Sequence, residues 1–195
     1  MNQILVVGKT NVGKTLFTLN FASHVGMKSV QITFRDAHTS HTKPFSIQEA
    51  IELFVSTTEH QTKCLQSLLI TLPWGKGTKQ CELIDSTGLV SHIHPDLPIR
   101  QAMGQTLRMV RQVHHMLHII DATQHAQIDE LDRQLANYGS YLTSYAVIAN
   151  KWDLVQSNSA LANLRKAFPK QPVIPVSSLH KTGFKEVRAH VRSIL

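Results

Sequence analysis

Apolar residues follow two alternating patterns along this chain of 195 residues. Short runs of branched apolar residues, or apolar residues at every second position, predict strands, whereas steps of three and four predict amphipathic helices. Strands are therefore expected at residues 4–7, 28–34, 64–72, 80–84, 116–120, 145–149 and 173–176. Helices are expected at residues 16–25, 45–55, 99–114, 128–138, 160–168 and 184–195.

The order of these elements predicts an α/β fold. Residues 64–72 and 80–84 flank Gly75-Lys76-Gly77, a turn that predicts an antiparallel hairpin. The other strands alternate with helices, which is typical of parallel strands. Residues 35–43 lack apolar periodicity and are expected to form an exposed loop. We therefore expect a mixed, mostly parallel sheet flanked by helices on both faces, in a single domain that spans residues 1–195.

The amino-acid composition says more about the expected binding partner than about the fold. Lys and Arg number 20 against 13 Asp and Glu, and the resulting net charge of +7 favours an acidic partner, with RNA as the leading candidate. The alternative is a scattered set of basic residues, because no run of five occurs. The two cysteines, Cys64 and Cys81, indicate reduced thiols and a cytoplasmic protein. The sequence shows no recognisable leader and no apolar run long enough to span a membrane.

A phosphate-binding motif is the most informative stretch. Residues 8–15 read G-K-T-N-V-G-K-T and fit G-x-x-x-x-G-K-[ST], between a predicted strand and a predicted helix. Glycines let the backbone approach a triphosphate, and the loop N–H groups and the helix N-terminus point at it. Lys14 is expected to reach the β- and γ-phosphates, and the Thr15 hydroxyl to bind Mg²⁺. The predicted nucleotide contacts here are Gly8, Lys9, Thr10, Asn11, Val12, Gly13, Lys14, Thr15 and Leu16.

A D-x-x-G motif, Asp85-Ser86-Thr87-Gly88, follows the strand at residues 80–84. The Asp85 carboxylate can hold Mg²⁺ through a water molecule. Gly88 can sense the γ-phosphate through its N–H, because glycine lets the chain come close. Taken alone, the motif is weak evidence, and a simple turn at the end of a strand is the alternative.

An N-K-x-D motif, at residues 150–153, follows the next-to-last predicted strand. The Asp153 carboxylate can accept hydrogen bonds from N1–H and N2–H₂ of guanine, a pair of donors that adenine does not offer. Asn150 can tie this loop to the phosphate loop, and the stem of Lys151 can lie over the base. The last predicted strand ends at Ser177-Ser178-Leu179, which can offer a backbone N–H to guanine O6.

The ordered set of phosphate loop, D-x-x-G, N-K-x-D and S-S-L resembles the P-loop GTPases, and most closely the Era/TrmE-type GTPases of the translation-factor-related branch. The resemblance covers nearly the whole chain. It implies a P-loop NTPase G domain that binds GTP with Mg²⁺ and hydrolyses it to GDP as a molecular switch. In that group the Asn of the phosphate loop, here Asn11, is associated with K⁺, which would supply the charge of an arginine finger. Lys14 and Asn11 are thus the candidate catalytic residues.

The first switch is the least constrained part of this resemblance. Residues 26–40 are similar to the first switch segment of Era, which makes Thr39 or Ser40 the hydroxyl that would join Mg²⁺. Residues 44–61 resemble an insertion, and its apolar side chains favour packing on the sheet over docking of a partner. Rival hydroxyls are those of Ser56, Thr57 and Thr58 within the insertion and Thr62 just after it.

The second switch departs from the usual pattern at Leu89, where Ras carries a water-orienting Gln. An apolar side chain cannot position water, so hydrolysis is expected to be slow or to depend on K⁺, on another group or on a partner. His92 and His94 are alternative water-positioning groups, while the histidines as a set are interpreted as surface or core residues rather than as a metal site. Candidate partner contacts, with a solvated surface as the alternative, are Trp74, Lys76, Arg100, Arg108 and Arg111.

Two functions remain open from the sequence. One is a hydrolytic GTP/GDP switch in ribosome- or RNA-related processes. The other is a nucleotide-dependent protein-interaction module with little intrinsic hydrolysis, as Leu89 and the insertion suggest. An ATP-using enzyme is disfavoured by the N-K-x-D motif. The expected partners are GTP and GDP, together with a ribosome, an RNA or a protein effector, and the resemblance implies that two copies can pair through the nucleotide face.

Overall fold

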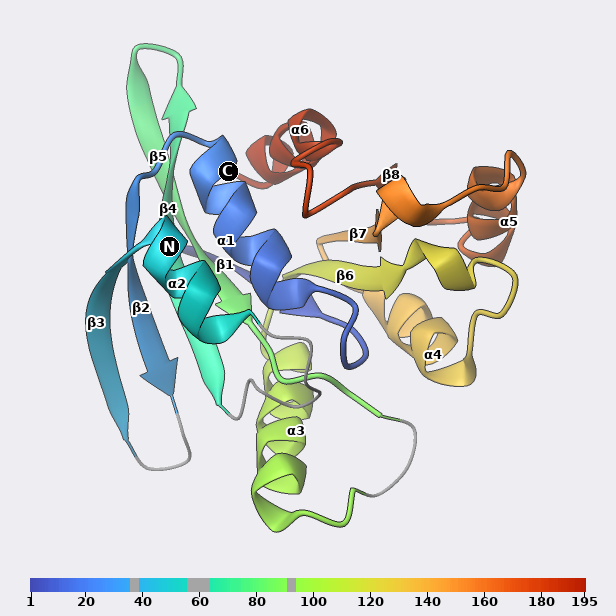
Figure 1. Cartoon of the computed structure of the whole chain (residues 1–195), viewed down its shortest axis with the longest axis horizontal. Coiled ribbons are helices and arrows are strands. Elements are labelled where there is room, and N and C mark those ends of the chain that lie inside the picture. The colour runs from blue at the N-terminus through green and yellow to red at the C-terminus, as the bar shows by residue number, and fades with distance from the viewer. Residues whose placement is uncertain (36–38, 56–63, 91–93) are drawn as a thin grey trace.

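The computed structural model describes residues 1–35, 39–55, 64–90 and 94–195. Its centre is one eight-stranded sheet with the strand order β3-β2-β4-β5-β1-β6-β7-β8 (Figure 1). The parallel part consists of β1 (Asn2–Val7), β5 (Gly77–Asp85), β6 (His115–Asp121), β7 (Ser144–Asn150) and β8 (Val173–Pro175). The antiparallel part consists of β2 (Ser29–Arg35), β3 (Ser40–Ser46) and β4 (Leu65–Trp74), with β4 paired to β5. The mixed, mostly parallel sheet predicted from the sequence is confirmed.

Helices cover both faces of the sheet, as predicted. One hydrophobic core lies under α1 (Lys14–His24), α2 (Ile47–Phe54) and α6 (Phe184–Ile194), and the other lies under α3 (Leu97–Val110), α4 (Glu130–Gly139) and α5 (Ala160–Ala167) (Figure 1). Two short 3₁₀ helices, η1 (Ala122–Gln124) and η2 (Trp152–Leu154), follow β6 and β7. The central strand β1 serves both cores, because Ile4 and Val6 face one and Leu5 and Val7 face the other.

The loop predicted at residues 35–43 is wrong over most of its described length. Residues 40–43 belong to β3, which pairs antiparallel with β2 from Arg35↔Ser40 to Ser29↔Ser46. Most side chains of β3 are exposed, and only Phe45 is partly buried. Because β3 is an edge strand with little contact with either core, its sequence lacks the alternation that identifies a half-buried strand.

The helix predicted at residues 45–55 is confirmed as α2, but it begins at Ile47, because Phe45 and Ser46 belong to β3. The Ser46 hydroxyl accepts a hydrogen bond from the Glu49 N–H at 3.1 Å, and the Glu49 carboxylate accepts one from the Ser46 N–H at 3.4 Å, which is a capping box. Phe54 packs against Phe34 and Phe45 with ring centroids 5.5 and 5.2 Å away. The apolar side chains in this region therefore pack on the domain, as expected. Among the helices of the described ranges, none has the length and apolar character to cross a membrane.

Candidate functional site

The phosphate loop connects β1 to α1 at the carboxyl edge of the parallel strands, and two of its positions require glycine. Gly8 has φ +152°, and a Cβ there would lie 2.1 Å from the Ile119 carbonyl oxygen. Gly13 has φ +91°, and a Cβ there would lie 2.5 Å from Nδ2 of Asn150. The loop is therefore packed against β6 and against the loop after β7, with no room for larger residues.

The buried residues Lys14 and Asp85 form a polar cluster with the partly buried Thr15 beneath this loop. The Lys14 ammonium donates to the Lys9 carbonyl oxygen at 2.6 Å, and the Thr15 hydroxyl donates to Oδ2 of Asp85 at 2.6 Å. Burial lowers the pKa of Lys14 to about 8 and raises the pKa of Asp85 to about 6, although each charge partly stabilises the other. Oδ1 of Asp85 is buried and has no hydrogen-bond partner among the described residues.

The segment after D-x-x-G lies directly along the phosphate loop. A Cβ on Gly88 would lie 2.6 Å from Cα of Thr10, so only glycine allows this approach. The Leu89 N–H donates to the Gly8 carbonyl oxygen at 3.1 Å, and Leu89 pairs with Lys9 as an isolated parallel bridge. The Leu89 side chain is 2% exposed and belongs to the core under α3, α4 and α5. It therefore points away from the space above the phosphate loop.

The Asn150 side chain joins three loops, as the sequence suggested for two of them. Its Nδ2 donates to the Val12 carbonyl oxygen at 2.8 Å. Its Oδ1 accepts from the Ser178 N–H at 2.9 Å and from the Ser178 hydroxyl at 2.7 Å. Asn20, a buried residue that the sequence did not single out, donates to the Ser178 carbonyl oxygen at 2.8 Å. Phosphate loop, N-K-x-D loop and S-S-L loop are thus held together by neutral hydrogen bonds.

The remaining residues of the two base-loop motifs surround this junction. Lys151 adopts a left-handed conformation with φ +59°, and its ammonium contacts Oδ2 of Asp121 at 2.7 Å. Burial alone would raise the pKa of Asp121, but the hydrogen bonds from Lys151 and Thr123 and the charge of Lys151 together outweigh it and hold this pKa below its ordinary value. Asp153 is an exposed residue whose side chain is 20% accessible, with Oδ2 3.9 Å from Nε2 of His180. Ser177 is buried and accepts the N–H of His180 at 3.1 Å, whereas Leu179 is 63% exposed.

Lys9 is turned away from the position above the phosphate loop and toward α4. Its ammonium contacts Oδ2 of Asp129 at 2.7 Å and Oδ2 of Asp132 at 3.1 Å. Oδ1 of the buried Asp132 lies 3.1 Å from Nε2 of His118, whose Nδ1 lies 2.7 Å from the hydroxyl of Tyr145. This network was missed because it joins residues from β6, β7, α4 and the phosphate loop that are distant in sequence. It makes His118 a core histidine, in agreement with the interpretation from the sequence.

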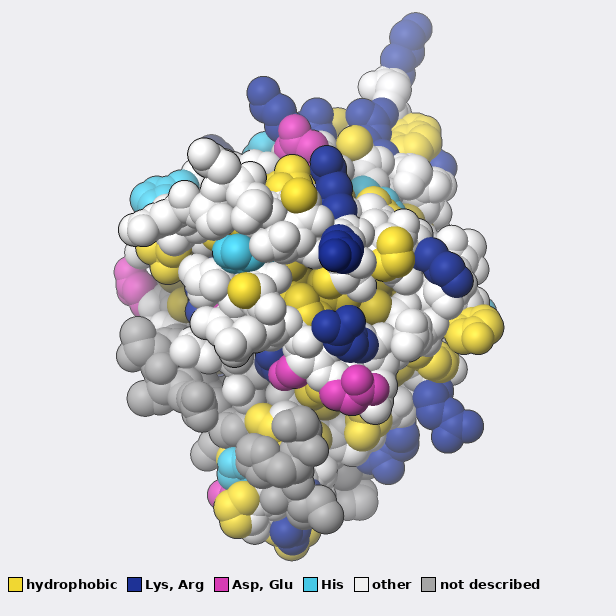
Figure 2. Space-filling view, turned by 90° about the vertical axis from the view of Figure 1, so that its right-hand side faces the viewer, with side chains coloured by type: hydrophobic (Ala, Val, Ile, Leu, Met, Phe, Trp, Pro, Cys, Tyr) yellow, Lys and Arg dark blue, Asp and Glu magenta, His cyan; other side chains and the backbone are white. Residues whose placement is uncertain are grey.

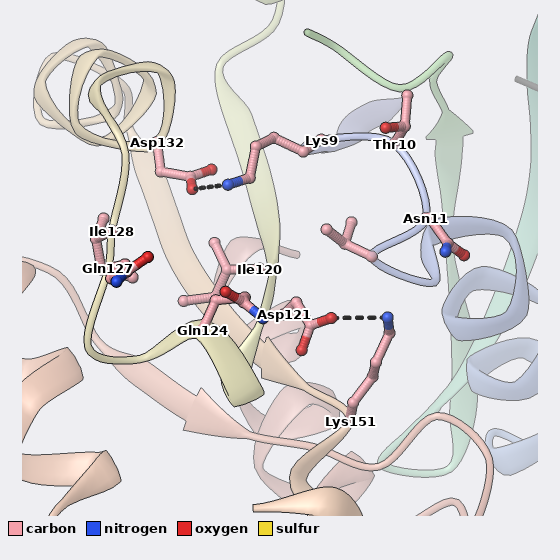
Figure 3. Close-up of a pocket in the computed structure, with 11 residues that line it drawn as sticks. Lys9, Thr10, Asn11, Ile120, Asp121, Gln124, Gln127, Ile128, Asp132 and Lys151 are labelled. Atoms are coloured by element: carbon pink, nitrogen blue, oxygen red, sulfur yellow. Dashed lines mark hydrogen bonds and ion pairs between the residues drawn. The ribbon is translucent and has the colours of Figure 1, made fainter. Parts of the chain in front are cut away.

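A polar cavity of about 250 Å³ lies between this network and the Lys151–Asp121 pair (Figure 3). Figure 3 shows the side chains of Lys9 and Asp132 on one side of it and those of Asp121 and Lys151 on the other. The cavity flanks the phosphate loop, which supplies Lys9, Thr10, Asn11 and Val12 to its lining. Within the described ranges, no group of three or more His, Cys, Asp or Glu side chains is arranged to hold a metal ion.

The candidate switch hydroxyls are only partly placed. Thr39 and Ser40 are exposed residues at the connection from β2 to β3, and Ser40 is the first residue of β3. Ser56, Thr57, Thr58 and Thr62 lie outside the described residues, as does His92. His94, the other alternative water-positioning residue, lies in the segment before α3, where its Nδ1 accepts the Asp96 N–H at 3.1 Å.

These loops define the class of protein. A glycine loop between a strand and a helix, with a buried Lys and a paired Thr and Asp at the carboxyl edge of a parallel sheet, is the site of a P-loop nucleotide-binding protein. A family model described as 50S ribosome-binding GTPase matches residues 3–151. The chain belongs to this GTPase family.

Similar proteins agree with this assignment. The GTPase Obg of Akkermansia muciniphila is 26% identical over 119 residues, which cover 56% of this chain and 33% of Obg. The structure of Aquifex aeolicus Era bound to GDP.AlF4- has a TM-score of 0.69 and 18% identity, and the match covers 97% of this chain and 55% of Era. An NFeoB mutant of S. thermophilus bound to GDP has a TM-score of 0.58 and 18% identity, with 97% and 60% covered. The chain thus spans a third of Obg and about half of Era.

Proposed function

We propose that this chain is one G domain that binds GTP with Mg²⁺ and hydrolyses it to GDP as a molecular switch. The observation that carries the proposal is the junction at Asn150, which links Val12 of the phosphate loop to Ser178 of the S-S-L loop. One amide thereby sets the spacing between a triphosphate site and a base site. Membership of the GTPase family supports the same function.

The phosphate end fits Mg²⁺ and a triphosphate. Asp85 has a buried oxygen without a partner in the described structure, and the Thr15 hydroxyl lies beside the other oxygen, so the two residues offer hard oxygen ligands. Bound Mg²⁺ would neutralise charge that develops on the β- and γ-phosphates. Lys14 would exchange the Lys9 carbonyl for phosphate oxygens. Which switch hydroxyl joins the metal stays a prediction, with Thr39 among the candidates.

The base end fits guanine. The Asp153 carboxylate would accept hydrogen bonds from N1–H and N2–H₂ of the base, with the Lys151 stem along one face. The N–H of Ser178 already bonds to Asn150, and the N–H of Ser177 bonds to the Thr182 carbonyl oxygen. The N–H of Leu179 is therefore the donor of this motif that we assign to guanine O6.

Activation of the attacking water is the step at which this chain departs from Ras, because Leu89 stands where Ras has a water-orienting Gln. Leu89 is packed in the core, so it neither orients water nor lines the site. We propose that hydrolysis depends on K⁺ bound beside Asn11, an exposed residue with φ +58° at the tip of the phosphate loop. A cation at that position would stabilise the charge of the transition state in the manner of an arginine finger.

GTP turnover at matched ionic strength in K⁺ and in Na⁺, with ATP as control, tests both parts of this proposal. We expect turnover of GTP but not of ATP, activation by K⁺, and loss of that activation in Asn11→Ala with GTP binding retained. Equal turnover in both salts would contradict the role of K⁺. Binding of ATP as tightly as GTP would contradict the GTPase proposal itself.

RNA or a ribosome is the partner that we propose for the switch. The family is described as ribosome-binding, and one of the similar structures is Era in complex with MgGDPNP and nucleotides 1506–1542 of 16S ribosomal RNA, with a TM-score of 0.69. The net charge of +7 supports an acidic partner for this chain. Pairing of two copies through the nucleotide face and a cytoplasmic location stay predictions.

A further inference from the structure

We propose that a basic surface formed by α6 and the β4–β5 hairpin binds the phosphate backbone of RNA, at the end of the domain opposite the nucleotide. This inference rests on the RNA partner proposed above and assigns it to one face of this chain. Figure 2 shows Lys and Arg side chains gathered at the top of the molecule, the end at which the hairpin and α6 lie in Figure 1.

A stripe of cations on α6 forms the first half of this surface. Lys185, Arg188 and Arg192 follow one another at steps of three and four, so they share one face of the helix. Lys181 precedes the helix by one turn and continues the stripe, with its ammonium 3.1 Å from the Ser23 hydroxyl. The opposite face of α6, with Phe184, Val187 and Val191, is buried in the core.

The hairpin supplies the second half. The Trp74 ring has the Lys79 ammonium 4.0 Å from its centroid and the Arg192 guanidinium carbon 5.0 Å from it. The ring orders Arg192 without neutralising it, because a ring quadrupole attracts a cation but carries no net charge. The Lys79 ammonium is also held by the main-chain oxygen of Leu195. Lys76 is exposed at the turn of the hairpin. Trp74 thus links the stripe on α6 to the cations of the hairpin in one continuous surface.

Most of the charges on this surface are not paired with an acidic side chain of the protein. Within the described ranges, five of its cations form no ion pair with an Asp or Glu side chain; these are Lys76, Lys181, Lys185, Arg188 and Arg192. The Lys79 ammonium donates to the main-chain oxygen of Leu195. Burial and the charges of Arg188 and Lys185 lower the pKa of His24, although Glu186 on α6 acts in the opposite direction. The site therefore has a positive field that an anionic polymer can neutralise.

The position of the surface makes it independent of GTP. The Asn2 side chain at the start of β1 donates to the Ile194 carbonyl oxygen of α6 at 3.0 Å, so the end of α6 lies at the amino end of the parallel strands. The nucleotide motifs follow the carboxyl ends of the same strands. The stripe begins at Lys181, two residues after Leu179 of the base loop, and runs along α6 toward the amino end of the strands. An RNA backbone at the far end of α6 and at the hairpin can therefore bind together with a nucleotide.

An anionic membrane is the main alternative, and the structure disfavours it. A helix that binds a bilayer surface inserts an apolar face into the lipid, and the apolar face of α6 is already buried in this domain. The Trp74 ring is covered by Lys79 and Arg192 instead of being presented to lipid. Ordered cations at helical intervals suit a polyanion that follows the helix.

Two triple variants with the same change in charge test the proposal. The first is Lys185→Ala/Arg188→Ala/Arg192→Ala, and the control on α5 and the turn after it is Arg165→Ala/Lys166→Ala/Lys170→Ala, three exposed residues. Binding of a labelled single-stranded RNA of mixed sequence is measured against KCl concentration. We expect the α6 variant to lose affinity by roughly tenfold or more, and the slope of log affinity against log salt to fall by about 2, because each lost phosphate contact removes about 0.7. The α5 control is expected to retain both values.

Equal losses in the two variants would overturn the proposal, because net charge alone would then explain binding. Absence of RNA binding by the wild-type chain would overturn it too, as would α6-dependent binding to phosphatidylserine vesicles with RNA binding unchanged. GTP affinity is measured on the same samples and is expected to be the same in all three proteins. Failure of the wild-type chain to bind GTP would instead refute the proposed GTPase function, so the two failures are distinguishable.

Discussion

The phosphate end of the site and its base end are built from different interactions. At the phosphate end, Lys14 and Asp85 are buried charges, and one oxygen of Asp85 has no partner among the described residues. At the base end, Asn150 makes three neutral hydrogen bonds that satisfy its neighbours. Buried charge without full compensation costs stability, whereas satisfied neutral hydrogen bonds add to it. The phosphate end is therefore suited to bind charge, and the base end also holds the fold together.

The largest effect is expected from Lys14→Ala. Loss of a buried cation that pairs with phosphate costs about 2–5 kcal/mol, so GTP affinity should fall by roughly 30- to 4,000-fold. The matched control is Lys9→Ala in the same loop, whose ammonium bonds to Asp129 and Asp132 instead. Isothermal titration of GTP measures both variants. A loss in Lys9→Ala as large as that in Lys14→Ala would show that the two lysines are not distinguished as the structure indicates.

The next effect concerns choice of base. Asp153→Asn keeps the shape of the side chain but replaces one acceptor oxygen with an NH₂ donor. This donor would then lie opposite an N–H donor of guanine, and the hydrogen bond would be lost. We expect GTP affinity to fall by roughly 10²-fold or more, while ATP affinity changes little, so that the preference for GTP shrinks. Competition of GTP and ATP for a labelled nucleotide measures the ratio. An unchanged ratio would remove Asp153 from the base site.

The base end should also affect stability without any nucleotide. Asn150→Ala leaves the Val12 carbonyl and both polar groups of Ser178 without their partner, and we expect unfolding to become easier by about 2–4 kcal/mol. The control is Asn163→Ala, an exposed residue with one contact to His125, which should change stability by less than about 0.5 kcal/mol. Urea denaturation of the nucleotide-free proteins compares them. Equal stability of the two variants would contradict the difference between the two ends.

The smallest expected effect is that of pH on the affinity for Mg²⁺–GTP. Mg²⁺–GTP binding requires an ionised Asp85 and a charged Lys14. The pKa of Asp85 is raised to about 6, so affinity should fall as pH drops below 6, by at most about tenfold per pH unit. The pKa of Lys14 is lowered to about 8, so affinity should also fall as pH rises above 8. Titrations across this range should give a plateau between pH 6 and 8, and Asp85→Asn should lose the acid limb while binding Mg²⁺–GTP more weakly throughout.

The same two groups predict how the nucleotide-free protein responds to pH. Asp85 has a folded pKa above its unfolded value, so its contribution to stability is present at low pH and is lost as pH rises through about 6. Lys14 has a folded pKa below its unfolded value, so its contribution is present at high pH and is lost as pH falls through about 8. Between these values both groups are charged and buried, and Mg²⁺–GTP should stabilise the protein most strongly there.

The sequence predicted the elements that touch a core and the loops that carry motifs. Periodicity works for β1, with Leu5 and Val7 on one face and Ile4 and Val6 on the other, because both faces are buried. It fails for β3, whose pairing with β2 depends on backbone hydrogen bonds rather than on an apolar face. An exposed edge strand therefore cannot be predicted from the alternation of polar and apolar side chains.

Motifs predicted where the site lies but not all the residues that hold it. A link from Asn150 to the phosphate loop was expected from the motifs, and the structure places it at the Val12 carbonyl oxygen. The bonds from Asn20 to Ser178 and from Lys9 to Asp132 were not expected. Such pairs join a motif to an ordinary helical residue far along the chain, and no local spacing identifies the partner. The structure alone brings them together.

The bond between Asn150 and Val12 also has a consequence for the time course of synthesis. The two residues are separated by 138 positions. At about 5–20 residues per second, a ribosome needs roughly 7–28 s to make the intervening chain. During that interval the nascent phosphate loop lacks the amide that joins it to the base loop. Tight nucleotide binding must therefore be a late event in biogenesis, and a captured nucleotide marks a chain whose sheet has been assembled as far as β7.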